Sequence, residues 1–485
     1  MKFFVLFALL IASRLACAQS GIVWSPTLEV ASSQYNNMHP RVVTDGSGNP
    51  MILWGSGDAK EVYFSRWTGN GFVTPKVLNP LTIPIFAASW AGPDIASHGD
   101  TVYVVFKETP EHDGGIYIVR SMDGGVNFSP PERVDAIADS MARFPAVVTD
   151  ANGNPLVSFM KFNPGWGNAR HVLAKSVVLG NTFGADVLGS GFSGGMVCDC
   201  CPATLTSSGN TTALLYRDNL NDLRNSWAGI SLDGGSTFAG GIEIDITDWM
   251  INACPSTGPD GIIIGDSLYT VFMSAASGTS LCYRSRSTIS TRQMETIEPL
   301  TPNFSGLGLQ NFPRIAVSGY ASAVVFNQTV NGSNQLAVQF TNKIFNGFPS
   351  GYSVLAANHV MNADVAISSN GKVHVVWEDM NSGTVKYRIG SFTVSGTKNQ
   401  SENLGTMLIY PNPATPSVLH CKLDTYTETG ITYQVFNAQG QLHISGVGQL
   451  SKGEMDLDVT GLRSGFYAIR INLNDQMYVQ SVVIE

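Results

Sequence analysis

Short runs of apolar residues, separated by turns rich in glycine, aspartate and asparagine, follow one another along most of the chain. One eight-residue turn pattern occurs twice, at 121–128 and 231–238, in the form Ser-x-Asp-x-Gly-x-x-Phe. Aspartate and glycine allow a tight turn with positive φ, and the phenylalanine can pack beneath it. Degenerate copies end at Phe72 and Phe183, so the closing phenylalanines are spaced by 56, 55 and 55 residues. Four short apolar runs in such a period predict the blade of a β-propeller rather than a helical repeat.

A short motif, usually centred on proline, precedes each predicted innermost strand. It occurs seven times, which favours seven blades, with six as the alternative. The strand predicted around 24–30 has no unit of its own, so we expect it to join the last blade and close the ring, which removes open sheet edges. The motifs are His39-Pro40-Arg41, Gly92-Pro93-Asp94, Phe144-Pro145, Cys201-Pro202, Cys254-Pro255, Phe312-Pro313-Arg314 and Asn362-Ala363-Asp364.

The composition is that of an exported all-β protein, because 44% of the 485 residues are apolar, 13% are charged and 50 are glycine. An apolar run at 3–12 and the small residues before position 19 predict a signal peptide over 1–18, cut after Ala18. Lipid attachment at Cys17 is the alternative. No other run is long enough to span a bilayer. A net charge of −9 without a basic cluster argues against a nucleic-acid partner.

A polar stretch at 395–403 interrupts the strand pattern. We therefore expect an all-β chain with a propeller over 19–394, a linker over 395–407 and a small β-sandwich over 408–485. The last segment contains Tyr410-Pro411-Asn412-Pro413 and Gly465-Phe466-Tyr467 and ends in a strand. In these features it resembles the C-terminal sorting domain of proteins exported by the type IX secretion system of Bacteroidetes. The resemblance implies binding to that machinery, removal of the domain, and release or attachment to surface polysaccharide; an ordinary ligand-binding sandwich is the alternative.

One face of the predicted propeller collects the loops that lead into the innermost strands and those that leave the second strands. Loops on a rigid scaffold commonly carry function, so we expect the site on this face. Each charged side chain there could instead pair with a neighbour at the rim of the central channel. The residues at these places are His39, Arg41, Asp94, Lys107, Glu108, Arg143, Lys161, Tyr216, Arg217, Asp218, Arg314, Asn327, Glu378 and Asp379.

The repeated turns on an exported propeller resemble the sialidase superfamily. The resemblance implies arginines that bind a substrate carboxylate, a tyrosine nucleophile activated by glutamate, and an acid/base aspartate, a chemistry that suits these side chains. The candidates for binding are Arg41, Arg143, Arg217 and Arg314, with His39 and Asp218, and those for catalysis are Asp94, Glu108, Tyr216 and Glu378, with Tyr269 as a second phenol. Sialidases have six blades and a Phe/Tyr-Arg-Ile-Pro motif, whereas here proline precedes arginine, so the resemblance implies the fold more strongly than the activity.

Four of the six cysteines that follow the predicted signal peptide lie in two motifs, Cys198-Asp199-Cys200-Cys201-Pro202 and Cys254-Pro255. Both precede a predicted innermost strand, so the sulfurs should converge near the channel, beside Tyr216-Arg217-Asp218. These motifs resemble a group of sialidase-like propeller proteins whose role the resemblance does not fix. Two disulfides tying adjacent blades, each worth about 2–4 kcal/mol, are one interpretation. A copper or zinc site formed by Cys198, Cys200, Cys201 and Cys254 is the other. Cys282 and Cys421 are expected to be isolated buried thiols.

Three functions therefore stay open. The first is a secreted propeller that binds glycans and hydrolyses them as an exo-sialidase, and the second is a non-catalytic surface adhesin that binds acidic sugars through its arginines. Neither requires a cofactor. The third is a metal-binding propeller centred on the cysteines. Signatures of serine hydrolases, zinc proteases and nucleotide enzymes do not occur in the sequence.

Overall fold

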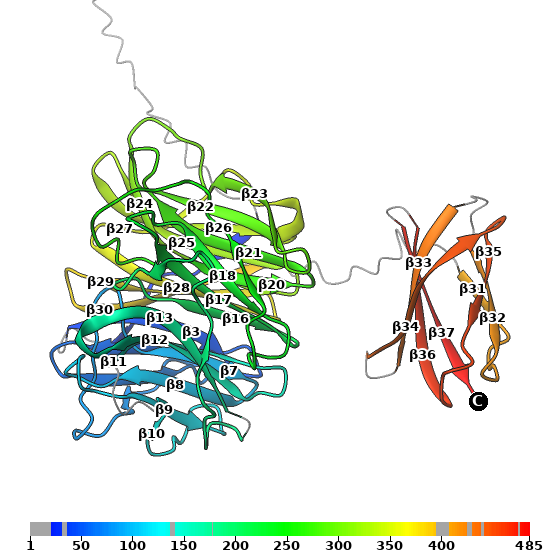
Figure 1. Cartoon of the computed structure of the whole chain (residues 1–485), viewed down its shortest axis with the longest axis horizontal. Coiled ribbons are helices and arrows are strands. Elements are labelled where there is room, and N and C mark those ends of the chain that lie inside the picture. The colour runs from blue at the N-terminus through cyan, green and yellow to red at the C-terminus, as the bar shows by residue number, and fades with distance from the viewer. Residues whose placement is uncertain are drawn as a thin grey trace, which may run out of the picture. The chain divides into compact units, whose positions relative to one another are not determined.

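The computed structural model describes residues 21–31, 36–135, 141–176, 178–393, 407–423, 429–437, 441–473 and 476–485. Within these ranges the regular structure is β-strand apart from two 3-10 turns, η2 (Pro164–Trp166) and η3 (Ile344–Asn346), so the all-β prediction is confirmed. The chain divides into two compact units, 1–394 and 395–485 (Figure 1). The predicted signal peptide and almost all of the predicted linker lie outside the described residues. No helix within the described ranges is long and apolar enough to cross a membrane.

In the described part of the first unit there are seven antiparallel sheets of four or five strands. Blade 1 consists of β3 (Asn37–Thr44), β4 (Pro50–Ser56), β5 (Glu61–Arg66) and β6 (Lys76–Val77). Blade 2 consists of β7 (Asp94–His98), β8 (Thr101–Lys107), β9 (Ile116–Ser121) and β10 (Glu132–Arg133). Blade 3 consists of β11 (Met141–Thr149), β12 (Pro155–Asn163), β13 (Gly167–Lys175) and β14 (Val187–Leu188). Blade 4 is β16 (Thr204–Ser208), β17 (Thr211–Asn219), β18 (Ser226–Ser231) and β19 (Gly240–Glu243), with β15 (Met196–Val197) also paired to β17.

Blades 5 and 6 are β20 (Asp260–Ile264), β21 (Ser267–Ser274), β22 (Leu281–Thr288) and β23 (Gln293–Pro299), then β24 (Leu307–Ser318), β25 (Ala321–Val330), β26 (Ser333–Thr341) and β27 (Ser353–Ala357). Blade 7 is β28 (Val360–Ser368), β29 (Lys372–Asp379) and β30 (Thr384–Phe392), joined by β1 (Ile22–Trp24) and β2 (Leu28–Ala31).

The innermost strands form a closed ring, in which β3, β7, β11, β16, β20, β24 and β28 contact one another in this order and β28 contacts β3 again. This arrangement is a β-propeller. The N-terminal strands pair with β30 as predicted, with Val23 opposite Ser391 and Leu28 opposite Tyr387. Hydrogen bonds between the two ends of the propeller therefore close the ring and leave fewer open edges.

The predicted motif Cys254-Pro255 precedes the fifth innermost strand, but not directly. β20 begins at Asp260, directly after Gly258 and Pro259, whereas the Cys254-Pro255 motif lies in the preceding loop. This start matches the second blade, where β7 begins at Asp94 after another Gly-Pro pair. The Gly258-Pro259 pair, which closes the same stretch of loop, stands directly before the strand.

The eight-residue turns join the third and fourth strands of their blades and are held by side-chain hydrogen bonds. Ser121 Oγ accepts the Gly125 N–H (2.9 Å) and donates to Asp123 Oδ1 (2.7 Å), which also accepts the Asn127 N–H (2.9 Å). The turn at 231–238 repeats these bonds. Hydrogen bonds from Asn127 and Ser121 lower the pKa of Asp123 to about 2. The repeated residues are therefore structural, as their turn chemistry indicates.

The second unit consists of two sheets, β31 (Met407–Tyr410), β32 (Val418–Leu423) and β35 (Glu454–Asp458), and β34 (Leu442–Leu450), β33 (Thr429–Asn437), β36 (Gly465–Leu473) and β37 (Gln476–Ile484). Both sheets contribute to one apolar core, which includes Leu419, Val435 and Ile469. Burial alternates strictly along β32, which is typical of a sheet with one buried face. Asn412 of the Tyr-Pro-Asn-Pro segment bonds the Ser481 carbonyl and the Val483 N–H, which fastens this segment to β37.

Candidate functional site: a pocket at the start of the innermost strands

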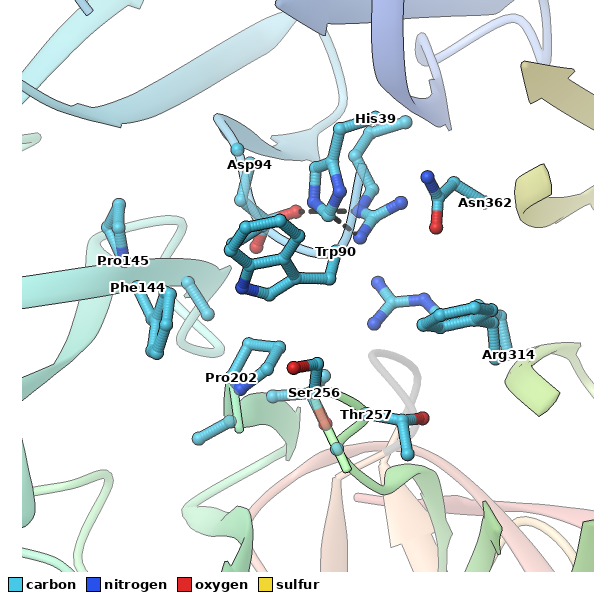
Figure 2. Close-up of a pocket in the computed structure, with 18 of the residues that line it drawn as sticks. His39, Trp90, Asp94, Phe144, Pro145, Pro202, Ser256, Thr257, Arg314 and Asn362 are labelled. Atoms are coloured by element: carbon cyan, nitrogen blue, oxygen red, sulfur yellow. Dashed lines mark hydrogen bonds and ion pairs between the residues drawn. The ribbon is translucent and has the colours of Figure 1, made fainter. Parts of the chain in front are cut away.

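Residues that lead into or begin the innermost strands of all seven blades line one cavity of about 70 Å³. Because every blade contributes, this cavity, the channel pocket, lies on the propeller axis. Its polar and aromatic lining residues are His39, Arg41, Trp90, Asp94, Phe144, Thr204, Ser256, Thr257, Phe312, Arg314 and Asn362 (Figure 2).

The backbone around the pocket shares one unusual conformation. His39, Phe144, Phe312 and Asn362 have φ values of 54°, 54°, 51° and 47°. Residues other than glycine seldom adopt this region, and it costs roughly 1–3 kcal/mol. In each case the strand pairing is interrupted there and resumes two residues later, at Arg41, Ala146, Arg314 or Asp364. The bulges therefore place the residue after the proline or alanine at the same level in each of these blades.

The positions where the strand pairing begins or resumes carry a charged ring, defined as Arg41, Asp94, Asp260, Arg314 and Asp364. Arg314 Nε lies 3.2 Å from Asp364 Oδ1 and 3.6 Å from Asp260 Oδ2, and Arg41 Nε lies 3.8 Å from Asp94 Oδ1. Burial, and then the charge of Arg314, lower the pKa of Arg41 to about 10. Burial also lowers the pKa of Arg314. The negative charges of Asp260 and Asp364 outweigh this effect, so the pKa of Arg314 is raised.

The three aspartates of the charged ring also connect neighbouring blades. In each, the Oδ2 oxygen accepts a backbone N–H of the next innermost strand at 2.9 Å: Asp94 from Val147, Asp260 from Ile315, and Asp364 from Val42. These carboxylate oxygens accept hydrogen bonds from buried backbone N–H groups, which would be costly to leave without an acceptor. Burial raises the pKa of Asp94. The predicted acid/base Asp94 therefore lies in the pocket, but part of its carboxylate serves the fold.

His39 and Glu378 are hydrogen-bonded to each other, and His39 also contacts Arg41 of the charged ring. His39 Nε2 lies 2.7 Å from an Arg41 terminal nitrogen, which requires the unprotonated ring nitrogen as acceptor. Burial lowers the pKa of His39 and so favours the neutral ring. Glu378 accepts hydrogen bonds from the His39 N–H (3.3 Å) and Asn362 Nδ2 (2.9 Å), and burial raises its pKa. Glu378 is not among the pocket-lining residues, so it positions His39 and Asn362 instead.

Trp90 is one of the pocket-lining residues that sequence reasoning missed. It lies in the loop before β7, is partly exposed, and occupies the middle of the ring of labelled side chains in Figure 2. The guanidinium of Arg314 points toward the same central space. The sequence signal that could have identified Trp90 was its nearness to the Gly92-Pro93-Asp94 motif, because that motif marks the start of an innermost strand.

Tyr216, Arg217 and Asp218 do not have the positions expected of substrate-contacting residues. All three are buried in β17 and none lines the channel pocket. Burial raises the pKa of Tyr216, whose hydroxyl lies 3.4 Å from the Phe192 N–H. Arg217 has no exposed surface, and its three nitrogens donate to the carbonyls of Thr257, Arg224 and Met273 at 3.1, 2.6 and 2.6 Å. Arg217 therefore does not have the predicted role in a carboxylate clamp; it connects backbone segments of the fold instead.

Two other candidates lie outside the pocket lining. Arg143 pairs with Glu111 (2.7 Å), donates to the Asp199 carbonyl (3.1 Å) and stacks on the Phe144 ring, whose centroid is 4.2 Å away. Glu108 accepts the Gly115 N–H at 3.0 Å. Of the ten predicted catalytic and binding residues, the pocket therefore brings together His39, Arg41, Asp94 and Arg314.

The cysteines predicted to converge do so, and we define Cys198, Cys200, Cys201 and Cys254 as the cysteine cluster. Cys198 Sγ lies 2.7 Å from Cys201 Sγ and 3.5 Å from Cys200 Sγ, while Cys200 and Cys254 lie within 4.8 Å of each other. All are free thiols in this structure. Hydrogen bonds from Cys200 and Cys201 lower the pKa of Cys198. Cys282 and Cys421 are buried free thiols, as predicted.

Comparison with known families identifies the second unit. Residues 408–485 match the family model described as the secretion system C-terminal sorting domain. The second unit is a sorting domain. The sorting domain marks the protein as one exported by the type IX system to the cell surface or the extracellular space, and it implies contact with that secretion machinery. No curated protein matches the chain.

Solved structures similar to the propeller share little sequence with it. A protein of unknown function from Dyadobacter fermentans is 11% identical over 77% of this chain and 100% of its own, with a TM-score of 0.46. A Hadza microbial sialidase is 12% identical over 74% and 66% (TM-score 0.44), and the Trypanosoma rangeli sialidase is 9% identical over 92% and 83% (TM-score 0.43).

Proposed function

We propose that this exported propeller binds glycans through the channel pocket, and that an acidic sugar places its carboxylate against Arg314. The supporting observation is the convergence of a tryptophan and two arginines in one concave site on the propeller axis. Sugar rings present apolar faces that pack on aromatic side chains, while a few fixed polar groups set orientation and specificity. Trp90 supplies such a surface, and Arg314 supplies the charge.

Arg314 fits this role better than Arg41. Arg41 donates one terminal nitrogen to the Pro40 carbonyl (2.9 Å) and directs the other to His39, so both are occupied. Within the described residues, the hydrogen bond of the Arg314 guanidinium is made by Nε to Asp364, which leaves its two terminal nitrogens to meet a ligand. A planar guanidinium presents such a pair of donors in the spacing of a carboxylate.

Binding without hydrolysis is the function that this pocket favours. Retaining sialidase chemistry needs a tyrosine with a glutamate partner, and the lining residues include no tyrosine. Asp94, the carboxylate that lines the pocket, is paired with Arg41 and the next blade. We therefore favour the surface-binding function over an exo-sialidase.

Calorimetric titration of the full chain with sialic, glucuronic and galacturonic acids, and with neutral galactose, tests this proposal. We expect at least one acidic sugar to bind more tightly than galactose, and Arg314→Ala to weaken it by about tenfold or more. Arg314→Lys keeps the charge beside Asp260 and Asp364 and should lose most of the affinity while retaining the fold. Arg120→Ala, in β9 outside the pocket, is the control.

Unchanged affinity in both Arg314 variants, or no binding of any acidic sugar or acidic oligosaccharide, would contradict the proposed ligand. A fluorogenic sialoside should not be turned over. Turnover that disappears in Arg314→Lys would show instead that the pocket is a sialidase active site.

A further inference from the structure

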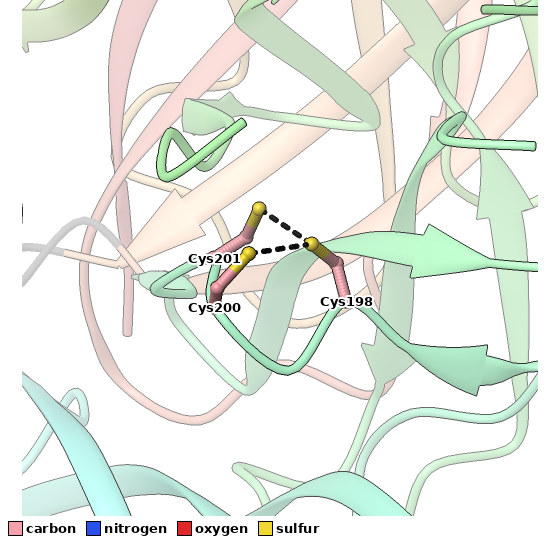
Figure 3. Close-up of side chains that lie close together, drawn as sticks. All are labelled: Cys198, Cys200 and Cys201. Carbon is pink, nitrogen blue, oxygen red and sulfur yellow. Dashed lines mark hydrogen bonds between the residues drawn. The ribbon is translucent and has the colours of Figure 1, made fainter. Parts of the chain in front are cut away.

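The cysteine cluster lies between two loops that lead into adjacent blades, and the channel pocket does not include its sulfurs. Cys198, Cys200 and Cys201 occupy the loop between β15 and β16, and their sulfurs face one another (Figure 3). Cys254 comes from the loop before β20. We propose that the cysteine cluster is a binding site for a soft metal ion, copper(I) or zinc.

The sulfurs form one connected group rather than two separate pairs. Cys198 lies close to two sulfurs at once, and Cys200 is within 4.8 Å of both Cys198 and Cys254. The sulfurs of Cys198, Cys200 and Cys201 all lie within 4.8 Å of one another, and Cys200 also belongs to a second group with Cys254 and Asp199. Thiolates that converge on a common point are what copper(I) and zinc require. The connection through Cys200 therefore favours an ion.

The distances between the sulfur atoms indicate how the site would change when it binds an ion. Sulfurs around a tetrahedral ion with bonds of about 2.3 Å lie about 3.8 Å apart. The 3.5 Å between Cys198 and Cys200 already suits an ion. Cys198 and Cys201, at 2.7 Å, must separate by about 1 Å on loading. Their loop can accommodate this because it has no regular secondary structure between β15 and β16.

Two arginines, Arg217 and Arg224, can compensate the net negative charge of a metal–thiolate group. Arg224 lies near Cys198 and Cys254, and Arg217 lies near Cys201. Arg224 is buried, and its Nη1 has no hydrogen-bond partner within the described residues. A buried guanidinium nitrogen without a partner is costly, and an anionic centre beside it removes part of that cost.

An ion can reach this site from solvent. Cys254 is exposed and Cys200 is partly exposed, whereas Cys198 and Cys201 are buried. The exposed carboxylate of Asp199 lies within 4.8 Å of Cys200 and Cys254. The outer residues would receive the ion and the inner sulfurs would hold it in a drier environment. This site is independent of the proposed glycan pocket, so either proposal can fail without the other.

Metal titration of the reduced full chain under anaerobic conditions, in competition with a copper(I) or zinc chelator, tests the site. We expect about one ion per chain, and a loss of affinity of about tenfold or more in Cys200→Ser. Zinc needs a fourth ligand, so Cys254→Ser should weaken zinc strongly but leave copper(I) on the remaining three sulfurs. Cys282→Ser, which removes an isolated thiol, is the matched control. Thermal unfolding of each apo variant separates loss of a ligand from loss of the fold.

Two results would overturn the proposal. One is a reduced full chain that binds copper(I) and zinc no more tightly than Cys200→Ser does. The other is peptide mapping of the natively exported protein that finds the cysteine cluster converted into two disulfides, with Cys198 joined to Cys201 and Cys200 to Cys254.

Discussion

Replacing Arg217 by methionine should destabilise the propeller itself. The guanidinium is fully buried and donates to three backbone carbonyls, including those of Thr257 and Met273 in the fifth blade. Methionine fills part of the volume but leaves the three carbonyls without donors, and each buried unpaired carbonyl costs about 1–3 kcal/mol. Removal of a desolvated charge offsets part of this sum. We expect the free energy of unfolding to fall by about 3–5 kcal/mol.

Urea unfolding followed by tryptophan fluorescence measures this change, with the sorting-domain transition analysed separately because a two-unit chain need not unfold in one step. Arg143→Met is the matched control, because its partly exposed guanidinium pairs with Glu111, and it should cost about 1 kcal/mol or less. Sugar affinity is measured on the folded fraction of both variants.

A substrate clamp predicts the opposite outcome for Arg217. In that case Arg217→Met would retain the stability of the parent chain within about 1 kcal/mol and lose affinity for acidic sugars. Such a result would refute the structural assignment of this arginine. It would also mean that the fourth and fifth blades open enough to expose the side chain.

Three further outcomes are expected. Asp364→Ala removes the acceptor of the Val42 N–H and a partner of Arg314, so it should cost about 3–5 kcal/mol in urea unfolding, whereas Asp364→Asn, which keeps an acceptor, should cost less; equal losses would contradict the blade connection. Burial lowers the pKa of His171 from 6.5 to about 3. Because the unfolded chain takes up this proton first, stability should fall by up to about 4 kcal/mol as pH drops from 6.5 toward 3. His171→Phe should remove that part of the pH dependence, and an unchanged slope would refute it. Trp90→Ala should weaken sugar binding by about tenfold while changing stability by about 1–2 kcal/mol, and an unaltered dissociation constant would exclude stacking on this ring.

The fold followed from local features of the sequence because propeller blades are built from neighbouring segments. The turn residues of 121–128 and 231–238 specify their own hydrogen bonds, and their spacing measures one blade. The absence of a separate unit for the N-terminal strand predicted its pairing with β30. The Tyr-Pro-Asn-Pro segment indicated the sorting domain through its residue pattern, and Asn412 fastens it to the last strand.

The site depended on contacts between segments about fifty residues apart, which periodicity does not encode. Arg217 and Arg314 looked alike in sequence, but Arg217 lies in the second strand of its blade and is buried against the next loop, whereas Arg314 lies in a first strand and faces the channel. Trp90 belongs to no catalytic motif. Its place in the pocket follows from the fold, which brings the starts of all seven innermost strands together at the axis. The sequence alone determined the repeat, the export domain and the convergence of the cysteines. Only the tertiary structure decided which charges reach the channel pocket and which hold the blades together, because burial depends on what the neighbouring blades place beside each residue.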